Sequence, residues 1–517
     1  MEFLVHERSR RPPVTAKQQP FVVLIRDSWD DSGLRTSFFV ELHTEDRRTL
    51  QIGTVKILKL GQNIGPTQLP TYSEDGLDQT YCSLGQSLSY YEALRTLGRR
   101  VYIPLLVGLR DIVYRPSIRE IFADEAGLTR SLERSGSAMR VLEDAAGMFD
   151  EANSRTPDSA GQPLSLTYQT NVGGSTFDLP LLFDDSSHLP ARVNAIIGYN
   201  GTGKTRLLAN LAMVAHADPL QRSDTSFIER YGQFLGQRSE AFGSVIAVSY
   251  SAFDTFEVPG RTAQDREHLQ RSGAVRGYSY CGLRSFASDG EPADTEPHRL
   301  KGIGEVAEEF FRTLDRLRDE PGRSLIEEAM VPISEEPSFQ RLELSGDVLQ
   351  RSDFASSIFP FLSTGHKIVL NIVAQLALNL QRRSMVLMDE PESHLHPPLL
   401  AALLRSVGLL LDRRDSFAVV ATHAPVVIQE IPRRYVRVLR RFGQITEVHE
   451  PEIETFGENV GLLTRHVFSL DSSSTDYQSV LRRLAGEFSL DEIDELFGGG
   501  LSAQARSYVA SLLRSRS

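Results

Sequence analysis

The segment GYNGTGKT, residues 198–205, has the residue types and the spacing of a loop that binds phosphate. It matches the pattern GxxxxGK(S/T) and lies between the apolar segment RVNAIIG and the helical pattern RLLANLAMVA, the context such a loop requires. Its glycines would let the backbone curl around the β-phosphate of ATP, Lys204 would reach the β and γ oxygens, and Thr205 would bind Mg²⁺. The alternative is a plain glycine-rich turn, but the chain has only six lysines, so a chance match is rare. The residues predicted to bind ATP here are Gly198, Asn200, Gly201, Thr202, Gly203, Lys204 and Thr205.

Two acidic residues close a second apolar segment, SMVLMDEPE at 384–392. Such a segment is typical of a buried strand. Its end would place Asp389 where it holds Mg²⁺ through water, and Glu390 where it polarises an attacking water. Apolar strands that end in acids are also common without this chemistry, so the phosphate loop upstream is what favours the catalytic interpretation.

Two further segments place polar residues at the ends of predicted elements. FAVVATHAP puts His423 just past an apolar strand, where its imidazole could donate a hydrogen bond to a γ-phosphate. FLSTGHKIVL, 361–370, puts Ser363 and Gly365 at the start of an apolar helix. Ser363 is a good helix N-cap, and a helix N-terminus with free amides is also an anion site. Both roles stay open for Ser363.

The elements around these segments predict the scaffold. Strand and helix signals alternate between 192 and 422, which predicts an α/β domain with parallel strands whose loops open on one edge. Apolar, β-rich runs over 20–60 predict an antiparallel meander, and residues 87–149 have helical spacing. Residues 258–300 are rich in Gly, Ser, Arg and Asp, which predicts a long surface loop.

Composition restricts the class of protein. The 68 acidic residues outnumber the 56 basic ones, which argues against a surface that wraps nucleic acid broadly, although a local basic groove stays open. Cys82 and Cys281 are the only cysteines, so a disulfide framework is not expected and a reducing cytoplasm fits. No signal-peptide core and no apolar stretch approaching 18 residues is present, so we expect a cytoplasmic protein without a membrane contact.

Three other segments allow a functional interpretation. CSLGQS, 82–87, resembles a nucleotide-contacting motif but precedes the phosphate loop. His394 and His396 form an HxH pair without an evident third zinc ligand, so a loop at a subunit interface is a better interpretation than a zinc site. PRRYVRVLRRF, 432–442, is either a solvated strand edge or a contact for DNA or an acidic partner. Its arginines are Arg433, Arg434, Arg437, Arg440 and Arg441.

The four ordered motifs together resemble those of the ABC-type ATPases, more closely the soluble RecF/SMC/OLD-like branch than transporter subunits. LSTGHK is similar to their signature motif, GYNGTGKT to their P-loop, DEPESHLHP to their Walker B motif and D-loop, and THAP to their His switch. The resemblance covers about residues 165–450. It implies an ABC-type P-loop ATPase fold of the α/β class, with a mixed sheet, an N-terminal antiparallel β part and helical insertions.

The resemblance also implies that ATP and Mg²⁺ are sandwiched in a homodimer, with Ser363 and Gly365 of one subunit contacting the γ-phosphate on the other. Glu390 and His423 would be the catalytic residues, and Thr205 and Asp389 would bind Mg²⁺. The sequence departs from the family at His366 and His396, and no clear Q-loop glutamine is present. Ser251 or Asp254 is the best substitute for it.

With these motifs placed, the sequence predicts seven parts. They are a flexible N-terminus (1–18), a β-rich start of the ATPase head (19–86), a helical insertion (87–150), a nucleotide-binding lobe with the P-loop (151–257), a long loop and helical subdomain (258–360), a lobe with the signature, Walker B and His switch (361–450) and a C-terminal helical segment (451–517).

By this resemblance we expect a dimeric ATPase switch that controls a partner effector. The chain is similar to stand-alone ATPases of bacterial antiphage systems, such as the Septu and PARIS types, which act beside a separate nuclease. Residues after 450 contain no nuclease-like set of acids, so any nuclease would be that partner. The alternatives are a RecF-like repair ATPase that binds DNA and a nucleotide-locked scaffold without turnover. Assembly beyond a dimer stays open.

Overall fold

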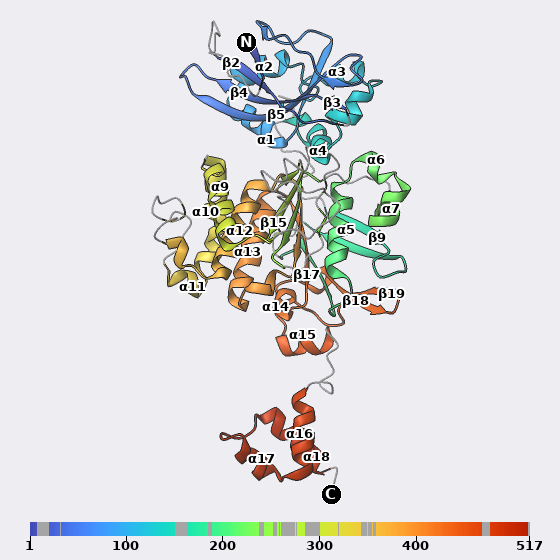
Figure 1. The fold of residues 1–517 in the computed structure, drawn as a ribbon, viewed down its shortest axis with the longest axis vertical. Coiled ribbons are helices and arrows are strands. Elements are labelled where there is room, and N and C mark those ends of the chain that lie inside the picture. The colour runs from blue at the N-terminus through green and yellow to red at the C-terminus, as the bar shows by residue number, and fades with distance from the viewer. Residues whose placement is uncertain are drawn as a thin grey trace.

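The computed structural model describes the chain in three parts that follow one another along its long axis (Figure 1). An N-terminal part with its own sheet comes first, a central part built on the largest sheet follows, and a small helical part holds the C-terminus. The described residues are 1–7, 20–31, 33–149, 163–184, 189–236, 242–251, 256–257, 259, 274–275, 277–284, 300–318, 320–342, 349, 354, 358–467 and 476–514.

The N-terminal part is a six-stranded sheet with helices packed on it. The strands run in the order β7-β1-β2-β4-β5-β8, and β2, β4 and β5 form the predicted antiparallel meander. Strand residues such as Phe38 and Leu84 share one core with helix residues such as Tyr91 and Leu106. Residues 20–86 and 87–149 therefore fold together around their own core, which differs from the predicted division into a head start (19–86) and an insertion (87–150). The elements are β1 (Glu2–His6), β2 (Phe21–Arg26), β4 (Ser37–His43), β5 (Thr49–Lys59), β7 (Tyr72–Ser73), β8 (Tyr81–Gly85), α1 (Leu88–Thr96), α2 (Arg99–Gly108), α3 (Pro116–Ile121) and α4 (Gly136–Asp144).

The prediction of a flexible N-terminus over 1–18 is wrong for Glu2–His6. These residues form β1, which pairs in parallel with β2 and in antiparallel with β7. Phe3 is buried in the core beneath the sheet. An isolated strand of this length has no intrinsic stability, so its order depends on two neighbours distant in sequence. Residues 8–18 of the predicted segment lie outside the described part of the chain.

The central part is built on an eight-stranded sheet in the order β14-β15-β13-β16-β17-β11-β18-β19. The pairs from β15 through to β18 are parallel, whereas β14 and β19 are antiparallel edge strands. The predicted α/β class with a mixed sheet is confirmed. The strands are β11 (Val193–Gly198), β13 (Val245–Ser249), β14 (Ala274–Val275), β15 (Tyr278–Gly282), β16 (Met385–Asp389), β17 (Phe417–Thr422), β18 (Val436–Phe442) and β19 (Ile445–His449).

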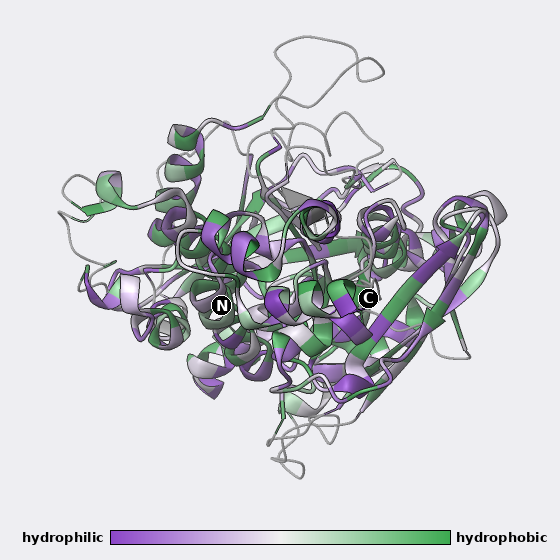
Figure 2. Ribbon diagram, turned by 90° about the horizontal axis from the view of Figure 1, so that it is seen from below, coloured by the Kyte–Doolittle hydropathy of each residue, from purple (hydrophilic) through white to green (hydrophobic). Residues whose placement is uncertain are grey.

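Both faces of this sheet are buried, so its inner strands are apolar at successive positions. Ile197 and Val420 face a core shared with four long helices, while the adjacent Ile196 and Val419 face a core shared with α5 and a smaller sheet. The helices at left and the α5 side at right in Figure 1 are these two layers. Figure 2 shows green and purple segments alternating around the helices, as expected for elements with one buried side. The elements are α9 (Ile303–Arg316), α10 (Glu320–Ser334), α12 (Thr364–Asn379) and α13 (Pro397–Arg413) on one face, and α5 (Lys204–His216), β9 (Leu164–Thr170), β10 (Phe177–Phe183) and β12 (Gln233–Leu235) on the other.

The prediction of a surface loop over 258–300 is wrong for Tyr278–Gly282, which forms strand β15 beside β13. A Cβ at Gly282 would lie 2.0 Å from the Ser249 carbonyl oxygen, so the close approach of these two strands requires glycine. Glycine here supports a strand instead of interrupting one. Most of the remaining 258–300 segment lies outside the described residues.

Shorter helices connect the elements of the central part and form the C-terminal part. The C-terminal helices share a small core of their own around Leu481, Ala485, Ile493 and Val509. Across the described ranges, no helix combines the length and the apolar composition needed to span a bilayer. The helices are α6 (Pro219–Arg222), α7 (Thr225–Tyr231), α11 (Pro337–Gln340), η5 (Phe359–Phe361), η6 (Pro391–His394), α14 (Pro425–Gln429), α15 (Val460–His466), α16 (Asp476–Glu487), α17 (Leu490–Leu496) and α18 (Ala503–Arg514).

Candidate functional site

The predicted phosphate loop joins the end of β11 to the start of α5. Gly201 and Gly203 have φ values of 84° and 93°, a region that other residues rarely adopt. A Cβ at Gly198 would lie 2.9 Å from the Leu439 carbonyl oxygen. The loop thus needs glycine at these positions, and the glycine N-cap of this 13-residue helix makes no side-chain cap hydrogen bond to its first-turn amides. This cradle fits a phosphate group.

Lys204 is held against the loop. Its Nζ donates to the Gly198 and Tyr199 carbonyl oxygens at 2.9 and 3.3 Å, and only 5% of the residue is exposed. Burial lowers the pKa of the Lys204 ammonium, and the carboxylates of Glu390, Asp389 and Glu392 oppose that shift. The lysine and the acidic strand end therefore influence one another electrostatically, as the prediction of a joint site requires.

The acidic pair sits at the end of β16, beside β17. Asp389 is 3% exposed and stands opposite Ala421 in the parallel register. Glu390 has φ 45° and ψ 56°, a left-handed conformation, and its N–H donates to the Ala421 carbonyl oxygen at 2.8 Å. A non-glycine residue in this region costs on the order of 1–3 kcal/mol and is concentrated at functional sites. Here it turns the Glu390 side chain out of the strand direction and toward His423.

His423 follows β17 and faces two carboxylates. Its Nδ1 lies 3.3 Å from Glu390 Oε1 and 3.2 Å from Glu392 Oε1. With acceptors on that side, the proton is assigned to Nδ1 when the ring is neutral, so the other ring nitrogen is left for a ligand. Half of the side chain is exposed. The predicted catalytic residues Glu390 and His423 therefore lie together.

Glu392 is the residue of this site that sequence reasoning misses. Its Oε1 accepts hydrogen bonds from Thr422 Oγ1 at 2.6 Å and from the His423 backbone N–H at 2.9 Å. The side chain is 8% exposed. Glu392 therefore fixes both the backbone and the ring of His423. The sequence does contain a signal, because Glu392 is a third acid in DEPE with no assigned role, but its partners Thr422 and His423 are visible only in the fold.

Glu392→Gln should slow the ATP turnover that the motifs predict on the order of 10²-fold, while the affinity for ATP changes little. The amide keeps the size of the side chain but removes the charge that holds His423, and a misplaced catalytic group costs about this factor. Steady-state kinetics would show the loss in kcat with KM nearly unchanged. Glu447→Gln, at an exposed Glu–His pair with a 3.0 Å contact, is the matched control. Equal kcat values for the two variants would contradict this role.

The signature segment begins α12 as the sequence predicts. Ser363 is the N-cap, and its Oγ accepts from the His366 N–H at 3.2 Å. A Cβ at Gly365 would lie 2.9 Å from the His394 carbonyl oxygen, so this glycine lets the signature contact the D-loop of its own chain. Among the described residues, no hydrogen bond joins Ser363 or Gly365 to the phosphate loop. The structure therefore does not bring this pair together with Lys204 in one chain.

His366 and His396, the two departures from the family pattern, both make structural contacts. His366 is 9% exposed, its Nε2 lies 2.8 Å from Ser338 Oγ, and its ring packs edge-on against Phe339. His396 caps α13 by accepting from the Leu399 N–H at 3.2 Å. Over the described ranges, no group of three or more potential metal ligands occurs. His366 therefore ties the signature helix to α11.

His366 should make the fold less stable at mildly acidic pH. Burial lowers the pKa of His366 below its ordinary value of 6.5, against the opposing effect of Glu336. Its neutral form is therefore favoured in the folded state, so its contribution is present above about pH 6.5 and is lost as pH falls below that value. Urea unfolding at about pH 7.5 and 5.5 should show a smaller loss for His366→Gln than for wild type. His449→Gln, an exposed histidine, should match wild type, and identical losses in all three proteins would contradict the assignment.

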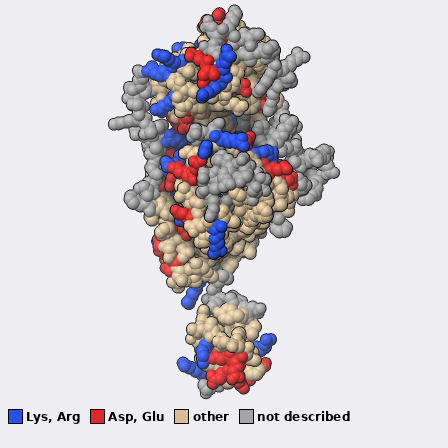
Figure 3. Space-filling model, turned by 90° about the vertical axis from the view of Figure 1, so that its left-hand side faces the viewer, with Lys and Arg blue, Asp and Glu red and all other residues tan. Residues whose placement is uncertain are grey.

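The remaining sequence candidates are dispersed. CSLGQS lies in β8 of the N-terminal sheet and at the cap of α1, where Ser87 accepts from the Tyr90 N–H. Ser251 follows β13, and Asp254 lies outside the described residues. The arginine run is not a uniform solvated edge, because Arg437 is 5% exposed and pairs with Glu450 at 3.5 Å. On the face in Figure 3, basic and acidic side chains of the described residues are mixed and form no continuous basic groove.

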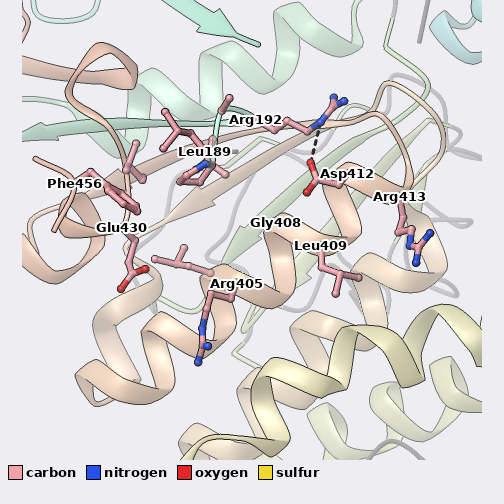
Figure 4. Close-up of a pocket in the computed structure, with 14 residues that line it drawn as sticks. Leu189, Arg192, Arg405, Gly408, Leu409, Asp412, Arg413, Glu430 and Phe456 are labelled. Carbon is pink, nitrogen blue, oxygen red and sulfur yellow. Dashed lines mark ion pairs between the residues drawn. The ribbon is translucent and has the colours of Figure 1, made fainter. Parts of the chain in front are cut away.

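A separate cavity of about 860 Å³ lies at the opposite end of β11 from the phosphate loop (Figure 4). Its wall includes Val193, where β11 begins, and Gly408 and Leu409 from α13. Arg192 forms an ion pair with Asp412 at 3.0 Å on its rim. Four strand residues, 194–197, lie between Val193 on the cavity wall and Gly198, so the cavity is distinct from the phosphate loop.

Comparison with known proteins gives three kinds of match. Residues 307–429 match a domain family described as "AAA domain, putative AbiEii toxin, Type IV TA system". Protein ea59 of Escherichia phage lambda is 30% identical over 546 aligned positions, which cover 100% of this chain and 99% of that protein.

Solved structures give weaker matches. A nucleotide-free ATP-binding cassette of an ABC transporter is 13% identical over 60% of this chain and 98% of that one, with a TM-score of 0.28. The SMC head domain from Thermotoga maritima is 12% identical over 57% and 99%, with a TM-score of 0.27. Scores this low carry no argument about activity.

Proposed function

Since the chain belongs to the family of protein ea59 of Escherichia phage lambda, and since it joins a phosphate loop to an acidic strand end, we propose that it binds and hydrolyses ATP with Mg²⁺. The observation that carries the proposal is the contact of His423 Nδ1 with Glu390 Oε1 at 3.3 Å, beside a buried Lys204 whose pKa responds to the same acids. A structural loop would have no need of this arrangement. The match of residues 307–429 to an AAA domain family supports the same conclusion.

The role of each residue in the proposed reaction follows from its position in the site. The amides of Gly201 to Thr205 and the Lys204 ammonium would hold the β- and γ-phosphates, while Thr205 and Asp389 would hold Mg²⁺. The metal supplies neutralisation of phosphate charge. Glu390 accepts a proton from the attacking water. His423 donates a hydrogen bond to the γ-phosphate through Nε2 when both ring nitrogens carry a proton, because Nδ1 faces Glu390 and Glu392.

We propose that the site is completed by a second copy of the chain. Ser363 and Thr364 are exposed at the N-terminus of α12, and the neighbouring Phe361 is 83% exposed. Phe359 and Leu362 on either side are buried, so the turn is anchored and Phe361 is presented outward. An exposed aromatic beside free helix amides suits a surface that closes on a nucleotide-loaded partner.

The finer role that we propose is a dimeric switch that controls a separate effector, such as a nuclease, in antiphage defence. Two matches support a part in conflict between phage and host: the domain family is described as a putative toxin of a Type IV TA system, and protein ea59 belongs to a phage. A RecF-like repair ATPase would need a continuous basic surface, which the face in Figure 3 does not present. Purification of the protein with its bound partners, followed by mass spectrometry, separates the two roles. A recovered nuclease would support the defence role, whereas recovered replication or repair factors would favour the RecF-like role.

Lys204→Ala should weaken ATP binding on the order of 10²-fold, since it removes a charge-assisted contact with the phosphates. Equilibrium binding in Mg²⁺ measures this effect, and phosphate release should fall in parallel. Lys59→Ala is the control, because Lys59 lies over Tyr81 in the N-terminal part. Wild-type protein that neither binds ATP nor releases phosphate would refute the proposal.

A further inference from the structure

Arg441, near the end of β18, is fixed beside the phosphate loop by three backbone carbonyls. Its Nη1 donates to the Gly201 oxygen at 3.4 Å, Nη2 to the Gly173 oxygen at 3.2 Å and Nε to the Gly443 oxygen at 3.0 Å. These carbonyls belong to the phosphate loop, the β9–β10 turn and the β18–β19 turn. Arg441 therefore joins three loops at one point.

The two turns are themselves joined, so this point is rigid. The Ser175 N–H donates to the Gln444 oxygen at 2.9 Å, and Thr446 Oγ1 donates to the Val172 oxygen at 3.4 Å. Gly174 has φ 124°, and a Cβ there would lie 2.9 Å from the Gln444 Cβ. The close approach requires glycine and keeps the guanidinium plane of Arg441 in place.

Among the described residues, no carboxylate neutralises the charge of Arg441. Elsewhere in the same arginine run, Arg434 pairs with Asp184 at 3.4 Å and Arg437 pairs with Glu450 at 3.5 Å. For Arg441, which is exposed, the described part of the chain offers carbonyl oxygens but no carboxylate within ion-pair distance. A fixed cation without a counterion at the mouth of a phosphate loop favours an anionic ligand.

We propose that Arg441 contacts the nucleoside end of ATP, with the face of its guanidinium stacked on the base. The inference rests on the proposed binding of ATP at the phosphate loop. Lys204 and the α5 amides account for the phosphates, and three edge donors of Arg441 are already engaged by carbonyls. Two N–H donors and the flat face remain, and arginine stacks on aromatic rings through that face. Arg441 then selects a nucleotide over a bare phosphate chain.

The test compares ATP with inorganic tripolyphosphate as displacers of a fluorescent ATP analogue, in Mg²⁺, on the full chain. Arg441→Ala should weaken ATP about tenfold, the range for loss of one stacked base, and leave tripolyphosphate within about twofold. Arg441→Lys should lose most of the ATP effect as well, because it keeps the charge without the plane. Arg434→Ala, in the same run, should match wild type with both ligands.

Three results would overturn the inference. Equal weakening of ATP and tripolyphosphate would mean that Arg441 shapes the loop or supplies charge alone. Unchanged ATP affinity in Arg441→Ala would mean no contact, and a selective loss of ATP in Tyr199→Ala instead would assign the base to Tyr199, which is 47% exposed in the loop itself. Wild-type protein that binds neither ligand would instead refute the proposed ATP binding. Arg441→Lys keeps the test usable if Arg441→Ala does not fold.

Discussion

Glu390→Gln is expected to lower ATP turnover about 10³-fold while ATP still binds. The substitution preserves the size of the side chain and removes the carboxylate that would accept a proton from the attacking water. Glu390 is 28% exposed, at hydrogen-bond distance from His423, and its left-handed backbone aims the side chain away from the core. The phosphate loop is untouched, so the bound nucleotide should persist and hold the closed dimer.

Single-turnover kinetics measure the rate of ATP hydrolysis, and light scattering measures the formation and decay of the dimer. Glu390→Gln should form an ATP-dependent dimer that decays slowly, whereas wild type should return to monomer as ATP is consumed. Glu430→Gln serves as control, because Glu430 lines the cavity at the far end of β11. Equal, negligible hydrolysis by wild type and Glu390→Gln would support a nucleotide-locked scaffold and end the switch hypothesis.

The sequence predicts the centre of this fold because burial on both faces of a parallel sheet leaves an unmistakable pattern. AIIG, MVLM and FAVVA are apolar at successive positions. They lead into the phosphate loop, into Asp389 and Glu390, and into Thr422 and His423, which must lie at the carboxyl edge of the sheet. Neighbouring strands in the structure are β16 and β17. That adjacency brings Glu390 to His423, whereas the α/β pattern alone predicts only that both lie at the same edge of the sheet.

The parts that sequence reasoning misses depend on contacts between distant segments. Glu392 acquires its role from Thr422 and His423 on another strand. His366 is explained by Ser338, 28 residues earlier. β1 is ordered by β2 and β7, and β15 by its packing on β13. None of these pairings has a local signal, because hydrogen-bond partners across elements are chosen by the packed structure and not by neighbours in the chain.

Ser363→Arg is expected to leave ATP binding intact and to abolish ATP-dependent dimerisation. The rate of ATP turnover should fall by at least the same factor as the fraction of dimer. Ser363 lies away from the phosphate loop of its own chain, on the exposed end of α12 beside Gly365 and the D-loop. An arginine there places a long cation where the proposed partner nucleotide would approach and removes a helix cap worth about 1 kcal/mol. Equilibrium ATP binding and light scattering at matched protein concentrations separate the two effects.

The matched control is Ser489→Arg, which makes the same chemical change at the N-cap of α17, in the C-terminal part. It should lose similar local stability yet dimerise normally. If both variants dimerise, Ser363 does not face the partner and the proposed trans contact fails. If Ser363→Arg loses ATP binding itself, the signature acts within its own chain. Only loss of the dimer with retained binding is consistent with a site that two copies of this chain complete for one another.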